Sequence, residues 1–312
     1  MNIQATQWLS RFRVDITSNS NRVFANGRQQ LQVTVTLAAR DGKAISEAQL
    51  DSIYLFEIDQ DGQYQRLDND LLAERERDFR FDYHAASGGV VQPLPDANNR
   101  TRRRTFYVSS ICPGGSLHTV YAGIQYDADA QFATDTAPFK SSVVIESIAP
   151  PVAHRSLFQL SLEPKRAYKK SSANYWDDEI EEQIGFFGFS DPQRKIVATV
   201  AHGISSGIRF YERNNFDEAL ISFELTNHYS QTCFICAYQP DHPAEDLPAI
   251  PRAHQMLLHL FHRRFYSRHW NDSWVELSAW TLIDQHGNAY TVHFLPGESG
   301  RSVDFRVVES AT

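Results

Sequence analysis

One stretch near the N-terminus alternates apolar and polar residues without a break, and it constrains the fold more than any other feature of the chain. It covers residues 30–37 and reads QLQVTVTL. Successive side chains of a β-strand point to opposite faces, so this pattern predicts a strand with one buried face. We therefore expect Leu31, Val33, Val35 and Leu37 to face a core.

Similar alternating stretches recur through the first half of the chain, separated by clusters of Gly, Asp, Asn and Pro. The turn Asp59-Gln60-Asp61-Gly62 has the chemistry of a hairpin, because Gly accepts a positive φ where two strands reverse. About seven short strands with such turns are typical of a β-sandwich. The other predicted strands cover residues 13–16, 52–58, 79–83, 105–108, 119–126 and 142–148.

Short glycine-containing motifs lie on either side of the long alternating strand. Asn26-Gly27 precedes it, and Asp41-Gly42-Lys43-Ala44-Ile45 follows it; later, Thr119-Val120-Tyr121-Ala122-Gly123-Ile124 is followed by residues 141–148. This arrangement resembles bacterial immunoglobulin-like domains of the invasin and intimin type over about residues 10–150. The chain departs from that family at residues 62–104, where it carries a longer, charged insertion. The resemblance implies an immunoglobulin-like β-sandwich.

The length of the chain predicts a second domain. At 312 residues it exceeds the size at which a single core usually stops growing, about 250–300 residues. Pro150-Pro151 is the best linker, since consecutive prolines favour an extended chain. We therefore expect an immunoglobulin-like domain at residues 1–150 and a second β-rich domain at 151–312.

The second half also alternates, but no family resemblance is evident in it. We expect it to end in a three-stranded meander with a turn at residues 284–288. Two helices are expected, at residues 174–184 and 253–265, so the whole chain is predicted to be mainly β with one or two short helices in its second domain. The predicted strands include residues 158–162, 196–200, 221–225, 274–283, 290–294 and 303–307.

The net charge and the cysteine content limit which partners the protein is expected to bind and in which compartment it is expected to be found. The net charge of -8 argues against nucleic-acid binding, which needs a surplus of Lys and Arg. Three cysteines are too few for a disulfide framework and suit a reducing compartment. No apolar stretch is as long as the hydrophobic part of a signal peptide or a membrane span. We expect a protein that is either cytoplasmic or exported without a cleaved signal.

The sharpest candidate for a metal site is the set His228, Cys233, Cys236 and His242. Two thiolates and two imidazoles form the ligand set of structural zinc. Residues 232–238, however, read as a strand, which sends positions 233 and 236 to opposite faces and holds their Cα atoms about 10 Å apart. The prediction is therefore structural cysteines, no favoured metal site and no cofactor.

A basic segment after residue 253 is the predicted binding surface. If it is helical, His259 and His262 lie one turn apart and could bind a metal or titrate together. The favoured interpretation is an apolar stripe facing the core, with the His and Arg residues in solvent. Arg and Trp are enriched at binding hot spots. The candidate binding residues are Arg263, Arg264, Arg268, Trp270 and Trp274.

Three other charged clusters have ordinary structural interpretations. The aspartates around residues 59–70 do not have the spacing of a calcium loop and suit a hairpin. The acidic residues 177–182 could be a glycosidase pair, but they suit the exposed face of the expected helix. The arginines at 100–104 are expected to lie on an exposed, protease-sensitive loop that could contact phosphate or an acidic protein.

No catalytic motif with a recognisable spacing occurs in the chain. The leading hypothesis is a non-enzymatic module that presents its β-rich second domain to a protein or carbohydrate partner. The alternatives are a metal- or carboxylate-dependent hydrolase with its site in the second domain, using some of His228, Cys236, His242, His259 and His262, and a component of a bacterial toxin or effector. The sequence leaves the oligomeric state open.

Overall fold

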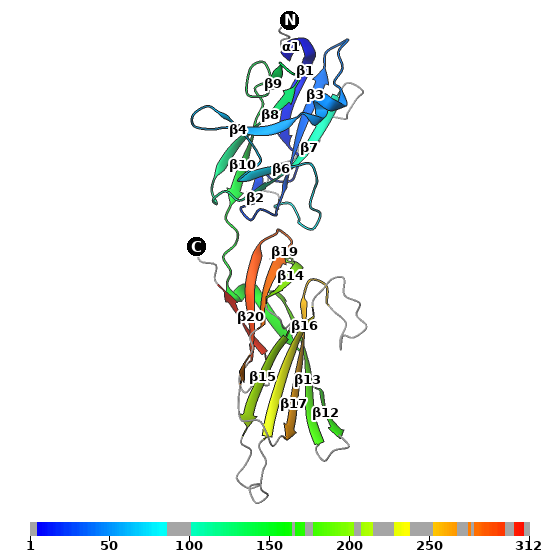
Figure 1. Ribbon diagram of the computed structural model, residues 1–312, viewed down its shortest axis with the longest axis vertical. Coiled ribbons are helices and arrows are strands. Elements are labelled where there is room, and N and C mark those ends of the chain that lie inside the picture. Colours follow the sequence, from blue (N-terminus) through cyan, green and yellow to red (C-terminus); the bar gives the residue numbers. More distant parts are fainter. Residues whose placement is uncertain are drawn as a thin grey trace, which may run out of the picture. The chain divides into compact units, whose positions relative to one another are not determined.

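The protein is mainly β in the computed structural model and divides into two compact units (Figure 1). The first comprises residues 1–151 with 286–288, and the second comprises residues 152–285 and 289–312. Two domains at residues 1–150 and 151–312, each folding independently, stay a prediction. The structure describes residues 5–85, 101–163, 166–171, 177–202, 207–214, 228–237, 252–266, 274–275, 278–296 and 303–308.

The first unit is an immunoglobulin-like β-sandwich. One sheet has the order β1-β3-β7-β6 and the other β2-β10-β8-β4-β5, with β9 paired to β8. The first strand is thus split between the sheets, and β2 pairs in parallel with the last strand, β10, while the other pairs are antiparallel. This is the strand order of the immunoglobulin fold. The first sheet contains β1 (Leu9–Ile16), β3 (Leu31–Ala39), β7 (Thr101–Ser110) and β6 (Leu71–Glu74). The second contains β2 (Arg22–Phe24), β10 (Val143–Ile148), β8 (Leu117–Gln125), β4 (Tyr54–Ile58), β5 (Tyr64–Arg66) and β9 (Gln131–Ala133).

The alternating stretch forms β3, and its predicted register is confirmed. Its four apolar side chains are at most 1% exposed. Thr34 and Thr36 on the opposite face are also buried, at 2% and 3%. Arg13 of β1 and Arg103 of β7 flank Thr36 in the sheet, and long Arg stems can cover such a residue while their charged ends stay in water.

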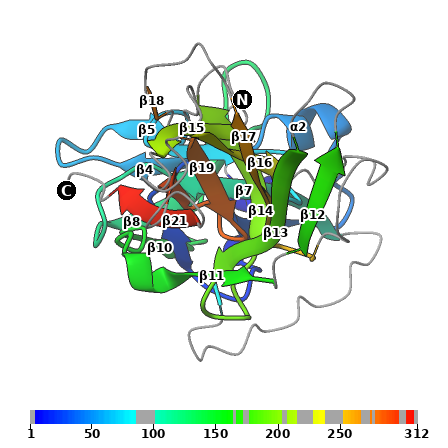
Figure 2. The same cartoon turned by 90° about the horizontal axis from the view of Figure 1, so that it is seen from below.

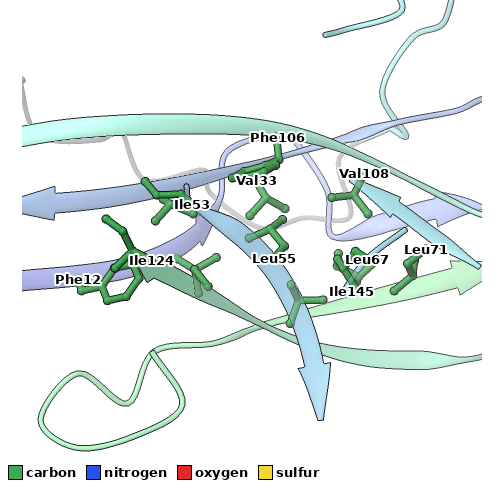
Figure 3. Close-up of a cluster of buried hydrophobic side chains, with 14 of the residues drawn as sticks. Phe12, Val33, Ile53, Leu55, Leu67, Leu71, Phe106, Val108, Ile124 and Ile145 are labelled. Atoms are coloured by element: carbon green, nitrogen blue, oxygen red, sulfur yellow. The ribbon is translucent and has the colours of Figure 1, made fainter. Parts of the chain in front are cut away.

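The core of the first unit lies between its two sheets (Figure 3). Val33, Phe106 and Val108 come from the first sheet and meet Leu55 and Ile145 of the second. All of these side chains are buried. Apolar burial from both sheets therefore holds this sandwich together.

A short helix, α2 (Glu47–Asp51), is fastened to the sandwich by arginines. A capping box of Ser46 and Gln49 begins it. Arg104 of β7 donates to the Asp51 carboxylate at 2.6 Å, and Arg102 pairs with Glu47. The prediction that these arginines lie on an exposed loop is therefore wrong, because residues 102–104 belong to β7 and two of them pair with helix carboxylates. Arg100 lies outside the described residues.

The strand predicted at residues 79–83 is also wrong. The backbone N–H of Phe81 donates to the Asp78 carbonyl, and the chain turns there. Phe79 is 80% exposed, and the Arg77 Cζ lies 4.9 Å from the centroid of the Phe79 ring. Alternation over five residues is not sufficient for a strand, and within the described residues this segment pairs with no strand.

The second unit has two antiparallel sheets. The larger has the order β11-β13-β17-β16-β15-β18, with β12 paired to β13, and the smaller has the order β14-β19-β20-β21. Figure 1 shows the long strands β13, β17, β16 and β15 side by side, and Figure 2 shows β12 next to β13. The larger sheet contains β11 (Phe158–Leu162), β12 (Arg166–Ser171), β13 (Asp177–Phe189), β15 (Gly207–Asn214), β16 (His228–Ala237), β17 (Met256–Tyr266) and β18 (Trp274–Val275). The smaller contains β14 (Ile196–His202), β19 (Ser278–Asp284), β20 (Ala289–Pro296) and β21 (Val303–Val308).

The predicted C-terminal meander is confirmed. Strands β19, β20 and β21 pair in sequence order. Gly287, in the turn between β19 and β20, has φ 80°, a conformation that favours glycine. The strand expected at residues 221–225 lies outside the described residues.

Both predicted helices of the second half are strands in the structure. Residues 177–184 belong to β13, and residues 256–265 belong to β17. Ile180 and Ile184 are four residues apart, a spacing that places them on one face of a helix and equally on one face of a strand. Met256, Leu257 and Leu258 are all buried, so β17 begins as a continuous apolar run covered on both faces, which periodicity does not separate from a helix. The described helices are α1 (Ala5–Trp8), α2 and the 3-10 turn η1 (Arg155–Leu157).

A buried ion pair joins the start of the smaller sheet to its central hairpin. Arg194 donates to the Asp284 carboxylate at 3.0 Å, where Asp284 is 0% and Arg194 17% exposed. The Tyr290 hydroxyl donates to the same carboxylate oxygen at 3.0 Å. Burial, and then the nearby Asp284 charge, raise the pKa of Tyr290 well above its usual value. The arrangement satisfies a carboxylate that would otherwise be strongly destabilising in the interior.

None of the helices in the described part of the chain is long and apolar enough to cross a membrane.

Candidate binding face

Four aromatic side chains gather on the outer face of the second sheet of the immunoglobulin-like unit. Tyr54 and Phe56 come from β4, Tyr64 from β5 and Tyr121 from β8. Leu55 points into the core, so its neighbours in β4 point to the opposite face. Register places Phe56 opposite Tyr121, and Ile58 opposite Tyr64. We call the set Tyr54, Phe56, Tyr64 and Tyr121 the aromatic face.

Phe56 is the floor of the aromatic face. It is 0% exposed although it does not belong to the core between the sheets. Its ring centroid lies 4.7 Å from that of Tyr64 and 5.6 Å from that of Tyr121. Tyr64, in contrast, is 52% exposed. One buried ring thus supports an exposed ring and a half-buried one, an arrangement that fixes their orientation.

A glycine makes room for the fourth ring. A Cβ added to Gly123 would lie 2.3 Å from the Tyr54 Cζ, so the Tyr54 ring lies directly over this glycine of β8. The Arg66 guanidinium lies over the Tyr54 ring, with its Cζ 4.3 Å from the ring centroid. Tyr54 is therefore held between the sheet and a cation.

One acid and one base border the aromatic face with unused hydrogen-bonding capacity. The Tyr64 hydroxyl donates to Asp135 Oδ2 at 2.7 Å, whereas Asp135 Oδ1 is buried and has no donor among the described residues. A carboxylate can accept about four hydrogen bonds. The Arg66 guanidinium has no hydrogen-bond or ion-pair partner in the described part of the chain. The polar groups at this face are thus the Asp135 carboxylate, which uses only part of its acceptor capacity, and the Arg66 guanidinium, whose donors have no partner among the described residues.

Exposed aliphatic side chains extend the same sheet face beyond the aromatic rings. Ile58 of β4 is 37% exposed, Leu117 of β8 is 69% exposed, and Val144 of β10 is 43% exposed. Each has the outward parity of its strand, opposite to the core residues Leu55, Val120 and Ile145. These side chains add exposed apolar surface to the sheet face that carries the aromatic rings.

The contact with Asp135 predicts an unusual tyrosine titration. The hydrogen bond to Asp135, helped by burial and the carboxylate charge, raises the pKa of Tyr64 to about 12. The contribution of this hydrogen bond to the stability of the folded state is therefore fully present below about pH 10, the usual tyrosine pKa. It is lost as the pH rises through about 12. In absorbance titrations of phenolate formation, we expect Asp135→Ala to lower the pKa of one tyrosine towards about 10. Tyr64→Phe should remove that titration; an unchanged curve in both variants contradicts the assignment.

The structure places the binding residues predicted from sequence on strands of the second unit. Arg263 and Arg264 are neighbours in β17, so they have opposite parity and lie on opposite faces of the sheet. Trp274 lies in β18. Arg268 and Trp270 lie outside the described residues. That these residues share one accessible surface stays a prediction.

Register nevertheless brings Arg263 and Trp274 into one row. Gln231 of β16 pairs with Arg263 on one side and with Tyr211 of β15 on the other, and Tyr211 pairs with Trp274. Positions in one row across a sheet share a face. Arg264 belongs to the next row, opposite Glu179 and Ser230.

The four candidate zinc ligands, which the sequence did not favour as a metal site, do not form a site within the described residues. His228, Cys233 and Cys236 lie in the continuous strand β16, as the strand interpretation predicts. His242 lies outside the described residues. Positions 233 and 236 have opposite parity, and so do His259 and His262 in β17. Within the described residues, no group of three His, Cys, Asp or Glu side chains is placed to hold a metal ion.

The acidic residues 177–182 lie in β13 rather than on a helix face, which corrects the helical interpretation. Their positions match basic positions on the neighbouring strands: Glu179 pairs with Lys169 and Arg264, and Glu182 pairs with Arg166.

Asp59 confirms the hairpin interpretation of the first aspartate cluster. Its Oδ1 accepts the backbone N–H groups of Asp61 and Gln63 at 2.9 and 2.7 Å, in the turn that joins β4 to β5. The backbone N–H of Gln63 is the main cause that lowers the pKa of Asp59. This aspartate shapes the turn that brings Tyr64 next to Phe56.

Sequence reasoning missed the aromatic face. The run Tyr54-Leu55-Phe56 is apolar at three successive positions, a sign that both faces of β4 carry hydrophobic side chains. Tyr121 and Asp135 are more than 60 positions away in the sequence, and only strand pairing places them beside that run.

Comparisons with known proteins identify no family. No protein-family model and no curated protein matches the sequence. One solved structure that matches is the collagen-binding domain of the Erysipelothrix rhusiopathiae surface protein RspB, with 8% identity over 96% of this chain and 94% of that one, at a TM-score of 0.17. A likeness at this score carries no argument about fold or function.

Proposed function

We propose that this protein is a non-enzymatic binding module of a bacterium, which contacts a protein or carbohydrate partner through the aromatic face of its immunoglobulin-like unit. The observation that supports this most is the 52% exposure of Tyr64 above the fully buried Phe56. Ordered aromatic side chains in contact with water are typical of binding surfaces, because they offer large contact areas at little cost in conformational entropy. Kinship with the invasin and intimin type of immunoglobulin-like domain belongs to the same proposal.

Binding of the intact protein to arrays of immobilised proteins and glycans tests this function. We expect saturable binding to at least one partner, weakened about tenfold by Tyr64→Ala, which removes an exposed ring without opening the core. Phe79→Ala is the matched control, since Phe79 is also an exposed aromatic residue beside an arginine of the same unit. No saturable binding, or equal loss in both variants, would contradict the proposal.

The row with Arg263 and Trp274 is proposed as a second contact surface, in the other unit. Arg263 and Arg264 supply a matched pair of variants, because they are sequence neighbours on opposite faces of β17. With the same partner, we expect Arg263→Ala to weaken binding about fivefold and to reduce its salt dependence, and Arg264→Ala to change neither. Equal effects of the two variants would remove this surface from the proposal.

A further inference from the structure

The chemistry of the aromatic face points to one class of partner. A pyranose ring presents C–H groups on one face and hydroxyl groups around its edge. The C–H groups carry small positive partial charges and pack well on the negative face of an aromatic ring. Tyr64 and Tyr121 offer such rings on either side of Phe56, at 4.7 and 5.6 Å between ring centroids.

The polar groups at the same face suit hydroxyls. A sugar hydroxyl both donates and accepts. Here the Asp135 carboxylate, whose Oδ1 is buried without a donor, has unused acceptor capacity, while the Arg66 guanidinium has donors with no partner among the described residues. Proline-rich peptides also bind aromatic residues. Proline, however, has no N–H to donate to a carboxylate. Hydroxyl-rich ligands therefore match this set of groups better than a proline-rich peptide does.

The charge at the face selects among carbohydrates. Asp135 and Arg66 bring one negative and one positive group, and both exert an electrostatic effect on Tyr54. Sulfated or otherwise anionic glycans need a local surplus of positive charge. The balanced pair favours an uncharged sugar chain.

The groups are also held in place before any ligand arrives. Phe56 fixes the rings from below, Asp135 holds the Tyr64 hydroxyl at 2.7 Å, and Gly123 lets the Tyr54 ring lie against the sheet. Prior ordering of this kind strengthens binding because less conformational freedom is lost. Resting on the function proposed above, we propose that the aromatic face is a binding site for a neutral polysaccharide, with Tyr64 and Tyr121 stacking on pyranose rings and Asp135 and Arg66 binding hydroxyls.

Affinity electrophoresis of the intact protein tests the inference. The probes are native gels that contain dextran, mixed-linkage β-glucan, galactomannan or xylan as neutral chains, heparin as an anionic chain, and poly-L-proline as a peptide. We expect retardation by at least one neutral polysaccharide. Tyr64→Ala should weaken that binding about tenfold or more, and Asp135→Ala and Arg66→Ala should weaken it about threefold to tenfold.

The controls separate this inference from the broader function. Phe79→Ala should bind like the unaltered protein, and Tyr64→Phe, which keeps the ring but loses the hydrogen bond to Asp135, should bind with intermediate strength. Unchanged thermal midpoints show that the variants fold. Three outcomes overturn the inference. The first is that no neutral polysaccharide retards the protein, and the second is that only heparin or poly-L-proline retards it. The third is that Tyr64→Ala is retarded as strongly as the unaltered protein. If the protein binds an immobilised protein through Tyr64 but binds no polysaccharide, the polysaccharide inference is overturned and the broader function stands. If it binds nothing in either assay, the inference and the proposed function are both overturned.

Discussion

Asp284→Ala is expected to destabilise the second unit by about 3–5 kcal/mol, the cost of leaving one member of a buried ion pair without its partner. Asp284 is 0% exposed, and its carboxylate accepts from Arg194 and from the Tyr290 hydroxyl. Removal of the carboxylate leaves the Arg194 guanidinium, 17% exposed, without its counter-charge. Urea unfolding followed by the fluorescence of the tryptophans measures the loss, and Trp280 reports on this unit because it belongs to its core.

Asp304→Ala is the matched control in the same unit. Asp304 also pairs with an arginine, Arg155 at 2.6 Å, but the two side chains are 53% and 57% exposed. Exposed pairs contribute about 0–1 kcal/mol. Asp284→Asn, which keeps hydrogen-bonding atoms and loses the charge, should fall between the two. Similar losses in Asp284→Ala and Asp304→Ala would show that burial of the ion pair does not matter.

The parts of the fold that local patterns specify could be predicted from the sequence. The strand β3 follows from its alternation, the β4–β5 hairpin from its turn residues, and the C-terminal meander from both. The short strands β2, β5, β6 and β9 have three or four residues each. Segments of that length hold too few residues to show a period, so pairing with neighbours determines them.

The errors have a physical pattern of their own. In β13 the apolar residues at positions 180 and 184 suit a helix as well as a strand, and in β17 the apolar run covers both faces. Local spacing therefore left the choice open, and sheet pairing decided it. Arg104 was expected at a loop because Pro, Asp and Asn residues precede it in the sequence, whereas it lies in β7 and pairs with Asp51 of α2.

The candidate site was harder to predict than the fold because it depends on contacts between distant strands. Tyr64 and Asp135 are 71 residues apart in sequence and 2.7 Å apart between hydroxyl and carboxylate oxygens. Neither residue has a distinctive local pattern. What makes them a candidate site is their position on one sheet face, which follows from the pairing of β4 with β5 and β8 and of β8 with β9.

Phe56→Ala is expected to cost about 3–4 kcal/mol, near the lower end of the range for large buried aromatic residues, and to abolish binding at the aromatic face. Phe56 is 0% exposed and contacts Tyr54, Tyr64 and Tyr121 through its ring. The cost should lie near the lower end because exposed Tyr64 can move inward and fill part of the space. That same movement would destroy the binding surface, so stability and binding should be lost together. Chemical unfolding of the first unit and affinity electrophoresis measure the two effects.

Phe56→Leu and Phe79→Ala show whether the two effects have this cause. Phe56→Leu keeps an apolar floor of smaller volume, so it should lose about 1 kcal/mol and retain part of the binding. Phe79→Ala removes a ring that is 80% exposed, so it should change stability by about 0.5 kcal/mol or less and leave binding unchanged. Full binding by Phe56→Ala would mean that Tyr64 and Tyr121 keep their orientation without the ring between them. The buried phenylalanine would then act in folding alone, and the exposed rings would lose the support on which the proposed site depends.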